Sequence, residues 1–312
     1  MNNMLQNDNI TAAIGNTPLV KLRNIVPKNC ADIYIKLEYF NPTGSYKDRM
    51  ALSIIGNAEY RGDIKPGTTI VECTGGSTGV SLAFVCSVKG YKFHVISSDA
   101  FAKEKLQTMR IFGAHLEIMP SDGGKTTPDL IPKMIARANE IGAAPGTYLA
   151  NQFTNADVLK GYSKMGDEIL NQLAVPVDVF CGAIGSCGMA MGVSKILKDA
   201  NPATKVVILE PASAPLISNN TKGSHKIDGI GVGFVPPFLD KSLYNEVKAI
   251  DEAEARSMAK LLAAKEGIFA GTSTGMNVVA ALQIAKELGP GHILVTVAVD
   301  SGMKYLSSGL FD

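Results

Sequence analysis

The feature that most constrains the fold is a regular alternation of short apolar runs with longer amphipathic segments. Runs rich in β-branched and aromatic residues, such as Ile33–Glu38 and His292–Val299, predict buried strands. Further strands are expected at residues 69–72, 92–97, 114–119, 178–181 and 205–210, and helices at 78–89, 101–112, 127–141, 157–173, 189–198, 253–266 and 276–287. Strands joined by helices pair in parallel through right-handed crossovers, so the pattern predicts an α/β protein with open parallel sheets.

Length and composition suit two such domains. The chain has 312 residues, of which 46% are hydrophobic and 19% charged, which is enough for a sizeable core. A second series of strands and helices is expected to begin near Tyr148–Ala150. Two α/β domains with a cleft between them are therefore the predicted architecture.

Charge and residue usage exclude several classes of function. The net charge is +1 and the chain has no Trp, which argues against nucleic acid and against an anionic membrane surface. The polar N-terminus and the lack of a long apolar stretch predict neither a signal peptide nor a membrane span. The five cysteines and four histidines show no metal-ligand spacing. We expect a cytoplasmic protein with free thiols and no metal.

A lysine at the start of a predicted helix stands out in Asn41-Pro42-Thr43-Gly44-Ser45-Tyr46-Lys47-Asp48-Arg49. Proline and glycine mark a turn, and the hydroxyl of Ser45 can cap the helix. Lys47 then lies in the first helical turn, where the helix dipole disfavours a cation by about 0.3–1 kcal/mol. A lone lysine of this kind is usually a solvated surface residue. The alternative is that its amine has a function, and the neighbouring motifs bear on that choice.

The lysine stretch resembles the lysine motif of the cysteine synthase and cystathionine β-synthase family, which uses pyridoxal 5'-phosphate (PLP). In that family the matching lysine forms a Schiff base with the cofactor. The resemblance therefore implies that Lys47 is both the catalytic residue and a cofactor-binding residue.

A second motif is the loop Thr74-Gly75-Gly76-Ser77-Thr78-Gly79, which follows a strand and opens a helix. Its backbone N–H groups suit an anion, although a plain strand-to-helix turn has the same pattern. The loop resembles the family's Thr-Ser-Gly-Asn-Thr-Gly segment, which holds the substrate's α-carboxylate. Two positions depart, since Gly75 replaces a serine, and Ser77 replaces the asparagine that reaches the ring hydroxyl oxygen of PLP. The resemblance implies substrate binding by Thr74, Gly75, Gly76, Ser77 and Thr78, with Ser77 also at the cofactor.

A third motif, Gly185-Ser186-Cys187-Gly188-Met189, also follows a strand and opens a helix. It resembles the family's Gly-Thr-Gly-Gly-Thr phosphate cup, with Cys187 in place of a glycine and Met189 in place of a threonine. A tight turn without a ligand is the bland alternative. The resemblance implies that these five residues hold the PLP phosphate, mostly through backbone amides. Cys187 is either a nucleophile or, more in keeping with its type, a small buried filler.

The fourth motif, Gly271-Thr272-Ser273-Thr274-Gly275, is the closest match to the family. The resemblance places Ser273 at the pyridine nitrogen of PLP, where a hydroxyl leaves that nitrogen largely neutral and favours β-elimination. A Gly-x-Ser-x-Gly pattern is also typical of a hydrolase nucleophile, but it follows a helix here and no His or Asp partner is evident.

Three weaker matches extend the resemblance from about Ile14 to Ser307. Gln152, in Asn151-Gln152-Phe153, is implied to join the carboxylate site, although Gly161 stands where the family usually has histidine. Gly231 lies in Gly229-Ile230-Gly231-Val232-Gly233-Phe234, which resembles the loop at the mouth of the cleft. Asp300-Ser301-Gly302-Met303-Lys304-Tyr305-Leu306-Ser307 resembles the family's closing segment.

The resemblance implies the tryptophan synthase β-like arrangement called fold type II, with PLP in the cleft between the two domains. Residues 48–150 would form a smaller, mobile, substrate-side domain. Residues 1–47 and 151–312 would form the larger domain that anchors PLP. A homodimer is implied in the same way.

The implied reaction is β-replacement on a β-substituted L-alanine of the O-acetyl- or O-phospho-serine type, via α-aminoacrylate. The nucleophile would be sulfide or a small thiol, as in a cysteine synthase. Gly75 and Ser77 motivate a first alternative, a PLP β-elimination lyase such as a cysteine desulfhydrase or a serine/threonine dehydratase. A second alternative is a non-catalytic binding protein on the same fold. A nicotinamide dehydrogenase is disfavoured, because no Gly-x-Gly-x-x-Gly opens the first strand–helix unit.

Overall fold

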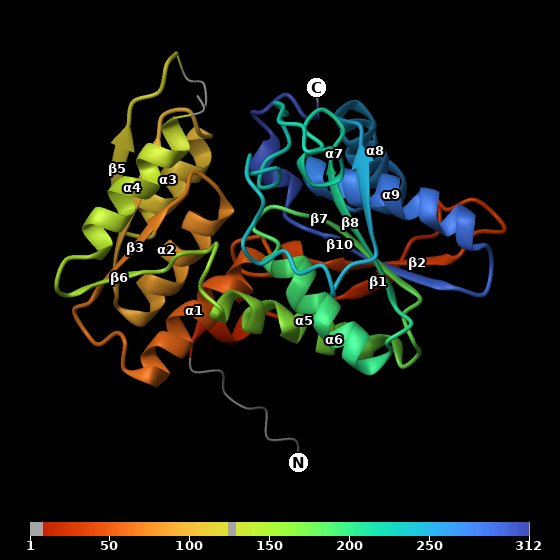
Figure 1. The fold of residues 1–312 in the computed structure, drawn as a ribbon, viewed down its shortest axis with the longest axis horizontal. Helices are drawn as coiled ribbons and strands as arrows, with labels where there is room; N and C mark the ends of the chain where they lie inside the picture. Colours follow the sequence, from red (N-terminus) through yellow and green to blue (C-terminus); the bar gives the residue numbers. More distant parts are fainter. Residues whose placement is uncertain (1–8, 124–128, 312) are drawn as a thin grey trace. The chain divides into compact units, whose positions relative to one another are not determined.

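The computed structural model describes residues 9–123 and 129–311 and divides into two compact units. The first unit comprises Met1–Asn16, Asn41–Thr43 and Lys47–Asp157, and the second comprises Thr17–Phe40, Gly44–Tyr46 and Val158–Asp312. Each unit holds one sheet with helices on both faces (Figure 1). Both sheets are α/β sheets with parallel pairing throughout, apart from one antiparallel strand at an edge, so the predicted fold class is confirmed. The predicted mobile and anchoring roles of residues 48–150 and of the rest stay predictions.

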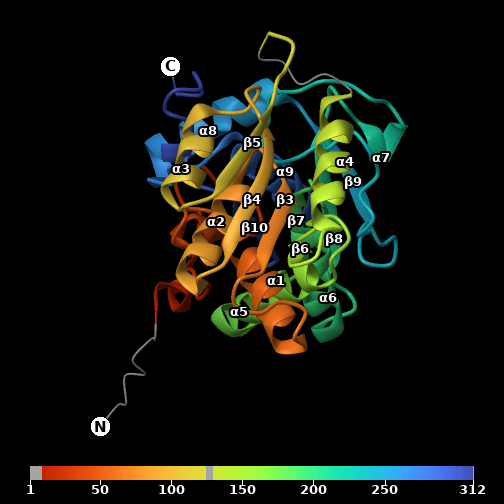
Figure 2. The same cartoon turned by 90° about the vertical axis from the view of Figure 1, so that its left-hand side faces the viewer.

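The first unit is built on a four-stranded parallel sheet in the order β5-β4-β3-β6. Its elements are a 3-10 turn (Ile10–Ala13), α1 (Lys47–Arg61), β3 (Thr69–Cys73), α2 (Ser77–Lys89), β4 (Lys92–Ser98), α3 (Lys103–Ile111), β5 (His115–Met119), α4 (Leu130–Gly142) and β6 (Thr147–Leu149). Helices α2 and α3 lie on one face of the sheet and α4 on the other, while α1 packs against α2 (Figure 2).

The second unit is built on a six-stranded sheet in the order β1-β2-β10-β7-β8-β9, in which only β1 runs antiparallel to its neighbour. Its elements are β1 (Leu19–Lys21), β2 (Asp32–Leu37), a 3-10 turn (Glu38–Phe40), α5 (Asp157–Leu173), β7 (Val179–Ala183), α6 (Gly188–Ala200), β8 (Lys205–Pro211), α7 (Leu216–Asn219), β9 (Glu246–Ile250), α8 (Glu252–Glu266), α9 (Thr272–Leu288), β10 (Ile293–Ala298) and a closing 3-10 turn (Gly302–Tyr305). Helices α8 and α9 cover one face, and α5 and α6 cover the other (Figure 1).

Each unit has its own apolar core. In the first unit, buried residues of β3 and β4 such as Val71 and Ile96 pack against Met134 and Ala138 of α4. In the second unit, the buried side chains of the central strands pack against α8 and α9. Strands buried on both faces are apolar nearly throughout, as in β10, which is why their sequence shows short continuous apolar runs rather than alternation.

Helix ends follow local capping chemistry. Gly90 ends α2 with φ of 77°, a left-handed conformation, and donates its N–H to the Cys86 carbonyl. Gly267 ends α8 in the same way, with φ of 69°. The carboxylate of Asp251 accepts the N–H groups of Ala253 and Glu254 at the start of α8. These caps set the ends of the helices that the sequence pattern predicts.

Several predicted elements need correction. Tyr148–Ala150 does not begin the second series, because β6 pairs with β3 and completes the sheet of the first unit. Helix α9 begins at Thr272 rather than at 276, since Gly271 is its N-cap. Strand β9 was not expected at all. Residues 127 and 128 of the predicted helix at 127–141, like residues 1–8, lie outside the described residues.

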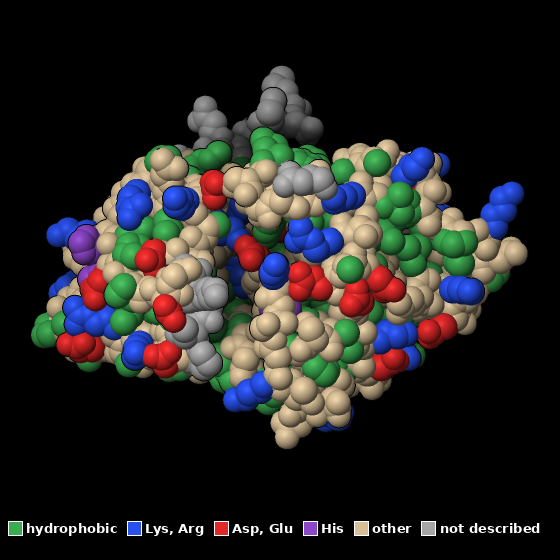
Figure 3. Space-filling model, turned by 90° about the horizontal axis from the view of Figure 1, so that it is seen from above, with side chains coloured by type: hydrophobic (Ala, Val, Ile, Leu, Met, Phe, Trp, Pro, Cys, Tyr) green, Lys and Arg blue, Asp and Glu red, His purple; other side chains and the backbone are tan. Residues whose placement is uncertain are grey.

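The surface carries no strong field of one sign on the face that Figure 3 shows. There, Lys and Arg side chains are intermixed with Asp and Glu side chains, in line with the net charge of +1. None of the helices within 9–123 and 129–311 is long and apolar enough to cross a membrane.

Candidate active site

The lysine of the first motif is the first residue of α1. Lys47 is buried, with 8% of its surface exposed. The preceding turn is held by Asp48, whose carboxylate accepts the N–H of Thr43 at 2.7 Å and its hydroxyl at 2.6 Å. The Thr43 hydroxyl also lies 3.3 Å from that of Ser81 in α2. The structure thus places the Lys47 amine in a protected setting on a fixed turn, which does not suit a solvated surface lysine.

The glycine-rich loop lies at the carboxyl end of β3, between two segments that follow neighbouring strands. Because β4 and β6 both pair in parallel with β3, the segments after these strands reach the same sheet edge. The hydroxyl of Thr78 donates to the side-chain oxygen of Gln152, 2.8 Å away. The hydroxyl of Thr74 accepts the N–H of Gly76 at 3.2 Å. The structure therefore brings together the substrate-site residues predicted within the first unit.

A buried glutamate, Glu72, links the backbone before the glycine-rich loop to the backbone of Gln152. Glu72, the penultimate residue of β3, is 3% exposed. Its two carboxylate oxygens accept the N–H groups of Cys73 at 2.9 Å and of Gln152 at 3.1 Å. Burial raises the pKa of Glu72 to about 7, while the two N–H donors and the positive charge of Lys47 act in the opposite direction. Glu72 thus fixes the backbone at Cys73 and at Gln152, on both sides of the predicted carboxylate-binding residues, and interacts electrostatically with Lys47.

The structure explains why position 75 is a glycine here, where the family motif has a serine. A Cβ built on Gly75 would lie 2.0 Å from the ring of Phe101, which follows β4. The ring fills the space that a serine would need, so the lost hydroxyl is replaced by an aromatic surface. The other departure, Ser77, is the first residue of α2, where the N-cap is Gly76.

The phosphate-cup motif lies at the carboxyl end of β7, in the second unit. Cys187 adopts a left-handed conformation with φ of 66° and is the N-cap of α6, but its side chain makes no capping hydrogen bond. A Cβ on Gly185 would lie 2.3 Å from the Gly229 carbonyl oxygen, and one on Gly188 would lie 2.4 Å from Cγ1 of Val158. These close approaches require glycine at both positions and leave the first N–H groups of α6 for an anion.

The side chains of the cup are buried. Ser186, Cys187 and Met189 are 6%, 2% and 4% exposed. Burial raises the pKa of the Cys187 thiol to about 12, so the thiol stays protonated at neutral pH. This argues against Cys187 as a nucleophile and supports its interpretation as a small buried filler.

Ser273 lies in the first turn of α9 and is 2% exposed. The start of this helix is joined to the segment after β10, because the Gly271 N–H donates to the Asp300 carbonyl at 3.1 Å. The hydroxyl of Tyr305 donates to the Asp300 carboxylate at 2.7 Å. The closing motif of the chain therefore packs at the base of the Ser273 helix.

A buried asparagine that the sequence reading missed links these elements. Asn277 of α9 accepts the N–H of Ala183 at 2.8 Å and donates to the Val297 carbonyl at 2.8 Å. It thereby ties α9 to the ends of β7 and β10, next to the phosphate-cup loop. The available signal was a single amide side chain in an otherwise apolar stretch of helix.

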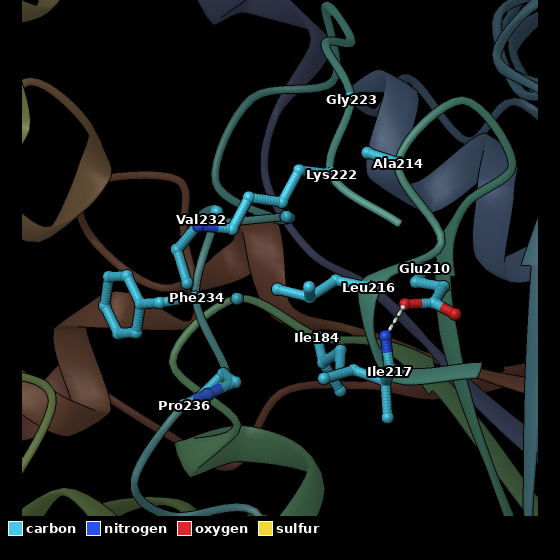
Figure 4. Close-up of a pocket in the computed structure, with 13 residues that line it drawn as sticks. Ile184, Glu210, Ala214, Leu216, Ile217, Lys222, Gly223, Val232, Phe234 and Pro236 are labelled. Atoms are coloured by element: carbon cyan, nitrogen blue, oxygen red, sulfur yellow. Dashed lines mark hydrogen bonds between the residues drawn. The ribbon is translucent and has the colours of Figure 1, made fainter. Parts of the chain in front are cut away.

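The Gly231 loop borders an open pocket in the second unit (Figure 4). Gly231 donates its N–H to the Ile184 carbonyl at 3.2 Å, just before the phosphate cup. Ile184 and Leu216 line the pocket, and Glu210 accepts the N–H of Ile217 at 2.7 Å (Figure 4). The predicted site residues of the second unit thus gather at the carboxyl ends of its central strands.

The residues present fit PLP. The first unit supplies a buried primary amine, and the second supplies uncapped helix N–H groups, the Ser186 hydroxyl and a cradle of glycines where no Cβ has room. An amine is what an aldehyde cofactor needs, and a helix N-terminus is what a phosphate needs. Within residues 9–123 and 129–311, no cluster of three or more His, Cys, Asp or Glu side chains could hold a metal ion.

Comparison with known proteins decides the family. The family model described as "Pyridoxal-phosphate dependent enzyme" matches residues 10–300. The chain belongs to the pyridoxal-phosphate dependent enzymes. A cysteine synthase of Staphylococcus aureus (strain N315) is 41% identical over 306 residues, covering 97% of each chain. An O-ureido-L-serine synthase of Streptomyces lavendulae is 38% identical, covering 98% of this chain and 93% of its own.

Solved structures agree. The O-acetyl serine sulfhydrylase isoform 3 of Entamoeba histolytica has a TM-score of 0.92 at 34% identity, covering 100% of this chain and 93% of its own. A hydrogen sulfide-producing enzyme of Fusobacterium nucleatum has a TM-score of 0.89 at 37% identity, covering 96% of this chain and 98% of its own. This pyridoxal-phosphate dependent enzyme is therefore a transferase of the cysteine synthase type with fold type II, which confirms the expected family, fold and cofactor.

Proposed function

We propose that this enzyme catalyses β-replacement on a β-substituted L-alanine of the O-acetyl- or O-phospho-serine type, with sulfide or a small thiol as nucleophile. The observation that carries the proposal is the buried amine of Lys47 at the start of α1, in a chain 41% identical to a cysteine synthase. Bound PLP supplies an electron sink for negative charge at the substrate's α-carbon.

In the first unit, Lys47 is proposed to anchor the cofactor through its amine and, once released, to take the substrate's α-proton. Its buried position keeps bulk water from competing for that proton. Glu72 lies close enough to interact with the Lys47 charge, so it would favour the protonated amine that this step produces.

The substrate's carboxylate is proposed to bind the N–H groups at the start of α2 and the polar side chains around them. These residues are Thr74, Gly75, Gly76, Ser77, Thr78 and Gln152. The hydrogen bond between Thr78 and Gln152 orients both side chains before substrate arrives, which lowers the cost of ordering them on binding.

In the second unit, the phosphate of the cofactor is proposed to bind Gly185, Ser186, Cys187, Gly188 and Met189. The N–H groups of α6 supply most of the contacts, so the loss of a threonine hydroxyl at Met189 is tolerable. Ser273 is proposed to face the pyridine nitrogen, where a hydroxyl does not hold a proton on the ring as a carboxylate would. Gly231, with φ of 58°, is proposed to border the substrate entrance.

A second candidate function is β-elimination without a nucleophile, as in a cysteine desulfhydrase or a serine/threonine dehydratase. The observations that favour it are Gly75 and Ser77, which change the polar contacts of the carboxylate site, and the likeness to a hydrogen sulfide-producing enzyme. The homodimer and the cytoplasmic location stay predictions.

Product analysis tests the proposal. The purified enzyme is incubated with O-acetyl-L-serine, O-phospho-L-serine, L-serine or L-cysteine, each with and without sulfide, and amino acid and keto acid products are measured. A sulfide-dependent amino acid product from one of the first two substrates is expected. Keto acid alone, at the same rate with and without sulfide, would instead establish the lyase.

A further inference from the structure

The ring of Phe101 lies against the backbone of Gly75. A Cβ built on Gly75 would be 2.0 Å from both Cγ and Cδ2 of that ring and 2.4 Å from Cδ1. Carbon atoms that are not bonded pack at about 3.5–4.0 Å. The ring therefore occupies the whole space that a side chain at position 75 would need.

The ring is held in this position by the fold of the first unit. Phe101 packs against the apolar cluster that includes Val71, Cys73 and Ile96. Its N–H donates to the Ser98 carbonyl at the end of β4, 3.2 Å away. Since β4 is the parallel neighbour of β3, the segment after β4 is carried to the loop after β3. Phe101 is thus a packed wall of that loop.

The contact is specific to position 75. A Cβ built on the adjacent Gly76 would meet nothing within 4 Å, and Gly76 has an extended φ of −122°. The backbone at Gly75 is not in the left-handed region, so the obstacle to a larger residue there is crowding, and the three atoms nearest to the built Cβ all belong to the Phe101 ring.

We propose that Phe101 and Gly75 form one specificity-determining pair in the amino-acid substrate site. The aromatic ring stands in place of a hydroxyl-bearing side chain at position 75 and covers the carboxylate-binding loop with an apolar surface. The pair controls the affinity for the amino-acid substrate, whereas the nucleophile's affinity does not depend on it. This inference rests on the proposed function, because it takes residues 74–78 as the carboxylate site.

The test is a double-variant cycle on the PLP-loaded enzyme, using Gly75→Ser, Phe101→Ala and the combination of both. The added side chain collides with the ring, so Gly75→Ser is expected to lower the thermal midpoint by about 5 °C. It is also expected to raise KM for the amino-acid substrate by roughly tenfold. In the Phe101→Ala background the serine has room, so adding it there is expected to cost little in either the thermal midpoint or the amino-acid KM, with KM for sulfide unchanged in all three variants.

The matched control is Gly76→Ala, alone and combined with Phe101→Ala. It adds a methyl group to the same loop at a position with open space, so its effects are expected to combine with those of Phe101→Ala additively, within about twofold in KM.

Three results decide the matter. Coupling in both thermal midpoint and amino-acid KM supports the proposal. Coupling in the midpoint with additive KM values overturns it, because the pair would then only pack. Additive effects in both also overturn it. Failure of the proposed function is distinguishable from failure of this inference, because the wild-type enzyme would then make no β-replacement product. In that case the affinity for the amino acid is measured from the change in the cofactor's absorption during titration with L-serine or L-cysteine.

Discussion

Replacing Glu72, the buried glutamate of β3 that precedes the loop proposed to bind substrate, should change how the stability of the fold depends on pH. The carboxyl of Glu72 has its pKa raised from 4.5 to about 7, chiefly by burial. A group whose pKa is raised in the folded state contributes stability that is fully present below the unfolded pKa and lost as pH rises through the folded pKa. Wild-type protein should therefore lose stability between about pH 4.5 and pH 7, relative to a variant that cannot ionise there.

The magnitude follows from the size of the shift. At about 1.36 kcal/mol per pKa unit, integration between pH 5.5 and pH 8 gives a loss of about 2 kcal/mol for wild type relative to Glu72→Gln. Added to this is a pH-independent cost of about 1–3 kcal/mol in the variant, because the glutamine amide cannot accept both the Cys73 and the Gln152 N–H groups. Wild type should thus be the more stable protein near pH 4, and its margin over Glu72→Gln should shrink by about 2 kcal/mol between pH 5.5 and pH 8.

Urea denaturation of both proteins at saturating PLP, at several pH values, measures this margin. Glu210→Gln is the matched control, since Glu210 is equally buried at 3% exposure and also accepts two backbone N–H groups, from Ile217 and Ser218. The Glu210→Gln variant measures how much free energy of unfolding is lost when a buried carboxylate that accepts two backbone N–H groups is replaced by an amide. A margin between wild type and Glu72→Gln that is constant, or that widens as pH rises, would refute the reasoning.

Three further outcomes are expected. Gly188→Ala should weaken PLP binding by at least roughly tenfold, because its Cβ would lie 2.4 Å from Cγ1 of Val158 and displace the cup; a spectral titration that gives the wild-type affinity would contradict this. Ser273→Asp should keep PLP bound but lower the β-replacement rate at least about tenfold, since a carboxylate would hold a proton on the ring nitrogen; an unchanged rate, or loss of the cofactor, would count against the assigned position. Asn277→Ala should cost about 2–3 kcal/mol in the free energy of unfolding, because it leaves the N–H of Ala183 buried without its acceptor; a cost below about 0.5 kcal/mol would show that the contact is dispensable.

Elements with strong local signals were predicted well from sequence. The helix at Asp157–Leu173 was expected at its observed bounds, since its apolar face repeats clearly over four turns. The strands of both sheets were placed within a residue or two, except where the pattern was short or polar. β9, Glu246–Ile250, alternates only weakly and lies at a sheet edge, so it was missed.

The remainder depends on contacts between distant residues. Thr272–Gly275 has the composition of a loop, yet it forms the first turn of α9, because glycine 271 can serve as an N-cap where the chain turns. Nothing local shows that β6 pairs with β3 rather than opening a second series. In the candidate site, the motifs located Lys47 and the two glycine-rich loops that open α2 and α6, whereas the contact of Phe101 with Gly75 needed the pairing of two strands to be known.

The central claim concerns one amine, and reduction of the PLP-loaded enzyme with borohydride tests it most directly. Reduction fixes the cofactor to the amine that carries it, and mass spectrometry of the digested protein then locates the added mass. The account predicts that mass on the peptide containing Lys47 and its loss in Lys47→Ala. The cofactor mass on any other lysine, with Lys47 unmodified, would contradict it.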